Sequence, residues 1–88
     1  MEHIYKWREM EPWYWNFIEL DVHGINKWNK PTAVVTVKKE IGGAAIKFYA
    51  TPLLFSELAK KQETMMIKYE GMVQSRSGHF YPKFRCIE

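Results

Sequence analysis

TAVVTVKKEIGGAAIKFYAT, residues 32–51, is the stretch that decides the fold. Two runs rich in β-branched and aromatic residues, 32–40 and 44–51, flank Ile41, Gly42 and Gly43. Paired glycines accept the positive φ that tight turns require, so the stretch predicts two antiparallel strands joined as a hairpin.

A helix is predicted directly after this hairpin. Thr51 can cap the first turn with its hydroxyl, and the missing N–H of Pro52 costs nothing at that position. Leu54, Phe55 and Leu58 form an apolar stripe, so the helix should cover roughly residues 52–62.

Three further strands are expected around this unit. Residues 13–23 alternate, with Ile18, Leu20 and Val22 predicted on the inner face and Glu19, Asp21 and His23 on the outer face. Residues 65–74 alternate as well, and Gly71 indicates a bend or bulge. Residues 79–87 form the last strand, in which Pro82 favours an edge position.

The predicted order is therefore β-β-β-α-β-β, a mainly β chain with one domain at residues 13–88. Residues 1–12 form an acidic, aromatic leader that is short, helical or irregular, since Ile4, Trp7 and Met10 recur every third residue before Pro12. A chain of 88 residues has room for one modest core and none for a cleft between two domains.

Composition points to a polyanionic partner. Residues 1–23 hold two basic and five acidic residues, a net charge of −3, whereas the rest holds eleven basic and five acidic residues, a net charge of +6. Four Trp, five Tyr and five Phe exceed what so small a core can bury, so some rings must face solvent or a partner.

Localisation is expected to be cytoplasmic. The single Cys86 excludes an internal disulfide framework and fits a reducing compartment. The N-terminal residues contain no apolar signal core, and no run of about 18 apolar residues occurs anywhere.

The strand order and the stretch MMIKYEGMVQSRSGHFYPKFRCIE, residues 65–88, resemble the small OB-fold single-stranded DNA-binding proteins of phages and mobile elements. This resemblance covers residues 13–87 and implies a five-stranded OB-like barrel with its helix between strands three and four. It places the binding surface on the outer faces of strands two and three, flanked by the first loop and the loop before the last strand.

Cations and rings occupy the positions that the resemblance assigns to binding, since cations neutralise phosphates and flat rings stack on unpaired bases. The candidate residues are Lys27, Trp28 and Lys30 in the first loop, Lys38, Lys47 and Tyr49 on the hairpin, Arg76 and His79 near the last loop, and Tyr81, Lys83 and Arg85 on the last strand.

Structural alternatives remain open for these residues. The Trp28 ring could fold back over the barrel mouth, and lysines on a solvated strand face give the same pattern. Trp13, Trp15 and Phe17 could form a second stacking platform, a dimer contact, or a core face with a register-shifting bulge between residues 17 and 18.

No catalytic, metal or cofactor site is expected. Alternate strand residues lie ~6.6 Å apart, which leaves Glu19 and His23 ~13 Å apart, too far for ligands ~2 Å from one ion. Cys86 and His79 differ by seven positions on one strand and so point to opposite faces.

The sequence thus predicts a protein that binds single-stranded DNA with little sequence preference, and the resemblance implies a role in replication or recombination of a phage or mobile element. Two alternatives use the same features. A protein-interaction module would dock or dimerise through the segment from Glu2 to Trp15, and an RNA-binding OB domain would use the same basic and aromatic surface.

Overall fold

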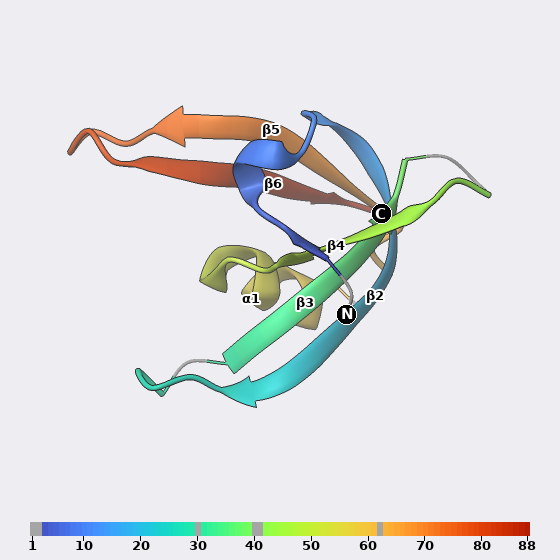
Figure 1. Ribbon diagram of the computed structural model, residues 1–88, viewed down its shortest axis with the longest axis horizontal. Helices are drawn as coiled ribbons and strands as arrows, with labels where there is room; N and C mark the ends of the chain where they lie inside the picture. The colour runs from blue at the N-terminus through green and yellow to red at the C-terminus, as the bar shows by residue number, and fades with distance from the viewer. Residues whose placement is uncertain (1–2, 30, 40–41, 62) are drawn as a thin grey trace.

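One sheet of six strands organises the chain in the computed structural model, which describes residues 3–29, 31–39, 42–61 and 63–88. The sheet curls into a half-barrel around one helix (Figure 1). The elements are β1 Ile4–Tyr5, a 3-10 helix η1 Trp7–Glu9, β2 Trp13–Ile25, β3 Pro31–Lys38, β4 Ala45–Tyr49, α1 Pro52–Lys60, β5 Met66–Gln74 and β6 Phe80–Ile87. The mainly β class is confirmed.

The predicted strand count of five and the predicted order β-β-β-α-β-β are both wrong, because the leader adds a strand before them. β1 pairs in parallel with the outer edge of β4, Ile4 opposite Lys47 and Tyr5 opposite Phe48. The leader helix shrinks to the three residues of η1, since strand pairing at Ile4 and Tyr5 satisfies backbone groups that a longer helix would use.

The order of strands across the sheet is β1-β4-β3-β2-β5-β6. Among the described residues no pairing joins β6 to β4 or β1, so the six strands form an open half-barrel. Side chains bridge the opening instead. The Phe84 ring of β6 stacks on Phe48 of β4 at 5.2 Å and on Tyr69 of β5 at 4.8 Å.

β2 is the strand that joins the two halves of the sheet. It pairs with β5 through Trp13–Asn16 and with β3 through Asn16–Ile25. A register shift between Phe17 and Glu19 confirms the bulge that was one of the three alternatives for the rings of this strand. Trp15 is buried and Phe17 packs against the core, as that alternative predicts, whereas Trp13 is exposed.

The predicted inner face of β2 is therefore only partly correct. Leu20 packs against the core, but Ile18 and Val22 are exposed. The register shift between Phe17 and Glu19 leaves Ile18 without a partner in the pairing with β3. Val22 lies on the same face as Leu20, because pairing is regular between them, and it is exposed further along the β2–β3 hairpin.

The predicted hairpin and helix are confirmed. β3 and β4 pair antiparallel, Gly42 has φ +84°, and Val35, Val37 and Phe48 are fully buried. Ile41 lies outside the described residues.

In α1, the Leu54 N–H donates to the Thr51 hydroxyl (3.1 Å), and Leu54 and Leu58 are buried. The helix ends at Lys60, two residues before the predicted end at Gln62, which lies outside the described residues.

The last two strands also follow the prediction. Gly71 has φ +86° within a register shift between Tyr69 and Met72, and its missing Cβ would lie 3.3 Å from Pro12 Cγ. β6 is an edge strand. The Met65 N–H donates to the Ile87 carbonyl, so the backbone groups of Ile87 face the neighbouring strand. In an antiparallel strand the backbone groups of every second residue face the same neighbour. Pro82 lies five positions before Ile87, so its nitrogen points away from β5 to the unpaired edge.

Candidate nucleic-acid interface

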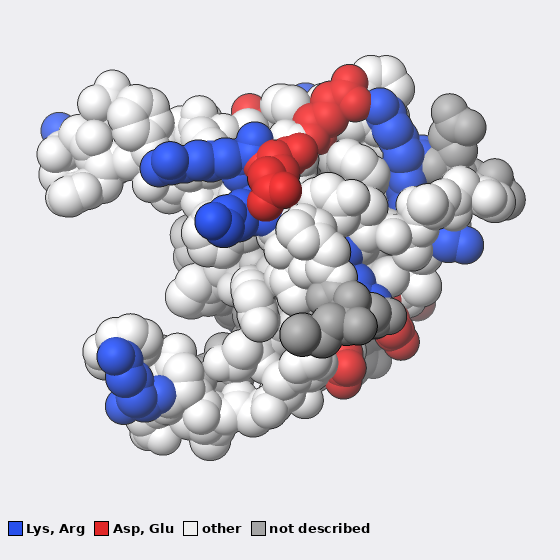
Figure 2. Space-filling view, viewed as in Figure 1, with Lys and Arg blue, Asp and Glu red and all other residues white. Residues whose placement is uncertain are grey.

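Two β-hairpins project from the same side of the molecule as separate arms. The β2–β3 hairpin ends in the loop at residues 26–29, and the β5–β6 hairpin ends in the turn at residues 75–79 (Figure 1). The space-filling view shows the surface hollowed between the two arms (Figure 2). Because β2 belongs to both halves of the sheet, its bends set the separation of the arms.

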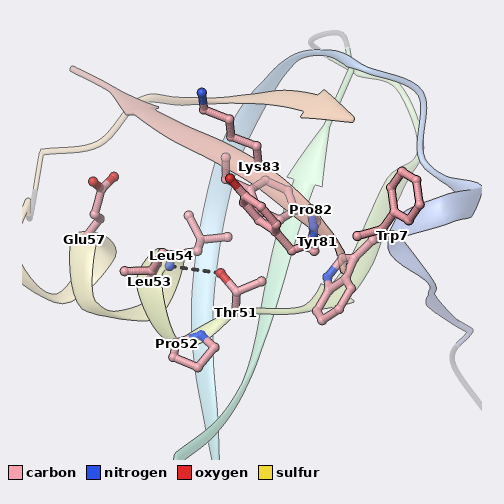
Figure 3. A pocket seen from close by; sticks show the side chains of 11 residues that line it. Trp7, Thr51, Pro52, Leu53, Leu54, Glu57, Tyr81, Pro82 and Lys83 are labelled. Carbon is pink, nitrogen blue, oxygen red and sulfur yellow. Dashed lines mark hydrogen bonds between the residues drawn. The ribbon is translucent and has the colours of Figure 1, made fainter. Parts of the chain in front are cut away.

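A groove of about 580 Å³ lies between the edge of β6 and the first turn of α1. Figure 3 shows Tyr81 and Pro82 on one side, Pro52 and Leu53 on the other, and Trp7 at one end. Among the described residues, the charged side chains that line it are Glu57 and Lys83. The groove is thus mainly apolar and aromatic, and β6 contributes to it because β6 is unpaired on that side.

Trp7 joins this groove to two neighbouring hollows. One, of about 590 Å³, is lined by Tyr5, Tyr49 and Phe80 among others, and the other, of about 450 Å³, reaches Asn26 at the base of the β2–β3 loop. All three hollows share Trp7. The three hollows therefore lie around one aromatic side chain.

Two hydrogen bonds fix Trp7 in this central position. Its indole N–H donates to the Tyr49 carbonyl (2.8 Å), and its own carbonyl accepts the Tyr69 hydroxyl (2.7 Å). Burial raises the pKa of the Tyr69 hydroxyl, which therefore remains a donor at neutral pH. The leader is thus packed against the sheet, with Met10 buried in the core.

Sequence reasoning did not identify Trp7 or Phe80 as site residues. Trp7 lay in a segment whose three-residue spacing favoured a helix, and Phe80 shared the inward parity of Phe84 and Cys86. Phe80 is nevertheless 61% exposed, because it stands where β6 has passed beyond the core. The excess of aromatic residues was the one sequence signal that pointed to exposed rings.

Three of the predicted residues line the groove and its neighbours. Tyr49 is 47% exposed and lines two of the hollows, while Tyr81 and Lys83 line the groove itself. The ammonium of Lys83 lies 3.5 Å from a carboxylate oxygen of Glu70.

Four predicted residues lie on the ends of the arms. Trp28 is 69% exposed, which rules out a ring folded back over the core, and its N–H donates to the Asn26 side chain (2.9 Å). The ammonium of Lys27 stands 4.5 Å from the centre of the Trp28 ring. Arg76 and His79 are exposed on the other arm, whose turn is closed by the Ser75 N–H donating to the His79 carbonyl. Lys30 lies outside the described residues.

The remaining predicted residues are not brought to the groove. Lys38 and Lys47 are half-buried on β3 and β4, and Arg85 lies on β6 opposite Lys68 of β5. Strand pairing puts Lys47 in one row with Thr36 and Glu19, and Tyr49 in one row with Val34 and Asp21. Carboxylates therefore share the outer face of the β2–β3–β4 sheet with its cations, so this wall is not uniformly basic.

The residues considered for metal binding and catalysis are not brought together in the described part of the chain. Asp21 Oδ2 lies 3.0 Å from His23 Nε2, and in the part of the chain that the structure describes no three His, Cys, Asp or Glu residues gather as metal ligands. Cys86 is buried, and burial raises the pKa of its thiol, whereas His79 is exposed at the other end of β6.

Comparison of the chain with protein-family models, with curated proteins and with solved structures yields no match. Across the described ranges, no helix is both long and apolar enough to span a membrane.

Proposed function

We propose that the protein binds single-stranded DNA with little sequence preference, in the groove between β6 and α1 and the two hollows beside it, with cations contributed by the two arms. One observation carries the proposal. Exposed rings of Tyr49, Phe80 and Tyr81 line hollows that all border Trp7, and the two arms carry the exposed Lys27 and Arg76. Unpaired bases stack on such rings whatever their identity, and the cations contact the backbone phosphates.

The strand order supports an OB-type assignment within this proposal. β2 to β6 with α1 follow the order β-β-β-α-β-β, with the helix between the third and fourth of these strands, and β2 lies at the centre of the sheet. The leader strand β1 is an addition at one edge. A role in replication or recombination of a phage or mobile element, in the cytoplasm, completes the proposal.

A fluorescence titration tests the proposal, since Trp7 and Trp28 lie at the groove and on one arm. The protein is titrated with oligo-dT and with duplex DNA at two salt concentrations. We expect tighter binding of the single strand, weakening with salt at a slope of about −0.7 per phosphate contacted. Absence of binding, or equal binding of the duplex, would overturn the proposal.

Charge variants assign the contacts to the arms. Lys27→Gln and Arg76→Gln should each reduce the salt slope by up to about 0.7, because each removes at most one phosphate contact. Lys60→Gln is the matched control. It removes an exposed lysine from the end of α1, which lines none of the three hollows. Equal effects of all three variants would indicate general electrostatic attraction rather than contacts at the arms.

A protein-interaction function is the second candidate, and the apolar lining of the groove is the observation that favours it. Leu53, which lines the groove, is the most exposed of the large apolar residues described. A peptide with apolar side chains would bind there without cations, so its affinity should not change between the two salt concentrations. Competition between matched DNA and RNA oligonucleotides separates the remaining alternative, RNA binding.

A further inference from the structure

A second group of rings and cations lies at the start of β2, away from the groove. Trp13 is 49% exposed and Tyr14 45% exposed. The ammonium of Lys39 stands 5.1 Å from the centre of the Trp13 ring, and that of Lys68 stands 5.2 Å from the centre of the Tyr14 ring. We name these four residues and Arg85 the ring–cation patch.

Strand pairing explains how the patch is assembled. Tyr14 is opposite Lys68, and Lys68 is opposite Arg85, so three neighbouring strands present these side chains on one face. Trp13 and Tyr14 line one hollow of about 430 Å³ together with Lys68 and Glu70. Two aromatic residues and a lysine therefore line one concave surface.

Two acidic residues beside the ring–cation patch form ion pairs with its lysines. Glu11 contacts the ammonium of Lys39, and Glu70 lies 3.6 Å from that of Lys68. Lys39 and Glu11 are both exposed, and ion pairs between exposed side chains contribute only about 0–1 kcal/mol, so a phosphate can replace the carboxylate beside Lys39 at small cost.

Glu70 also connects the patch to the groove. Its carboxylate pairs with Lys68 of the patch and, at 3.5 Å, with Lys83, which lines the groove. Lys83 and Lys68 therefore lie on either side of the Glu70 carboxylate, and together they lead from the groove across β6 and β5 to Tyr14.

From this arrangement we infer that the ring–cation patch is a second contact surface for the same nucleic-acid strand, which leaves the groove across β6 and stacks further bases on Trp13 and Tyr14. The inference rests on the proposed function. It predicts that the patch contributes to the affinity for long strands alone. A strand too short to leave the groove never reaches the patch.

Oligonucleotide length is therefore the variable that tests the inference. OB-type sites cover about 4–16 nucleotides, so dT of about 5 and of about 20 nucleotides separate the groove from the groove plus the patch. Trp13→Ala and Tyr14→Ala should each weaken binding of the long strand by about tenfold and leave the short strand within about twofold. Lys68→Gln should act in the same direction, with a smaller salt slope for the long strand alone.

Control variants separate the possible failures. Ile18→Ala removes another exposed side chain of β2 and should change neither affinity. If the ring variants weaken both lengths alike or neither length, the second surface is overturned while the groove proposal stands. If the wild-type protein binds neither oligonucleotide, the proposed function and this inference fall together.

Discussion

Two sets of aromatic rings in this protein have opposite surroundings. Phe48, Tyr69 and Phe84 stack on one another across the open side of the half-barrel, with Phe48 and Tyr69 buried. Tyr49, Phe80 and Tyr81 are exposed in the groove or in the hollows beside it, although they lie on the same strands as Phe48 and Phe84.

The comparison separates the rings that stabilise the fold from the rings that are available to bind a ligand. No described pairing joins β4 to β6, and the stacked rings of Phe48 and Phe84 make the contact between these two strands instead. The exposed set contributes little to the core and remains available to a ligand. Substitutions should therefore separate stability from binding.

The largest expected effect is on the buried set. Phe48→Ala should lower the free energy of unfolding by about 3–5 kcal/mol, because it leaves a cavity and removes the ring on which Phe84 stacks. Denaturant titration measures this change. Tyr49→Ala at the next position is the control and should change stability by about 0.5 kcal/mol or less. Equal losses from the two variants would break the distinction between the sets.

An intermediate effect is expected for binding alone. Trp28→Ala should weaken oligo-dT binding by about 1–3 kcal/mol, because it removes an exposed stacking ring, and should leave stability within about 0.5 kcal/mol. Met65→Ala, which removes another exposed side chain that lines none of the hollows described, should leave both quantities unchanged. An unchanged dissociation constant for Trp28→Ala would remove that residue from the site.

The smallest expected effect concerns the hydrogen bond from Tyr69 of the buried set to Trp7 at the groove. Tyr69→Phe keeps the buried ring but removes the hydroxyl that holds the Trp7 carbonyl, at a cost of about 0.5–1.5 kcal/mol in stability. If this bond positions Trp7 in the groove, oligo-dT affinity should fall as well. Loss of stability with unchanged affinity would show that Trp7 is held well enough by its bond to Tyr49.

Local patterns were sufficient for most elements of the fold. The Gly42 turn, the Thr51 cap, the Gly71 bulge and the edge position of Pro82 each depend on the chemistry of one or two residues. The candidate site was less predictable. Trp28, Tyr49 and Tyr81 are exposed as expected, but Lys38, Lys47 and Arg85 lie away from the groove.

The sequence by itself determined the mainly β class, the positions of the main strands and the helix, and an aromatic content too large for the core to bury. Only the tertiary structure decided that the leader adds a strand beside β4, and that three hollows lie around Trp7. The physical reason is distance along the chain. Turns and caps are set by neighbouring residues, whereas the bond from Trp7 to Tyr49 spans 42 positions and forms only when the sheet has curled.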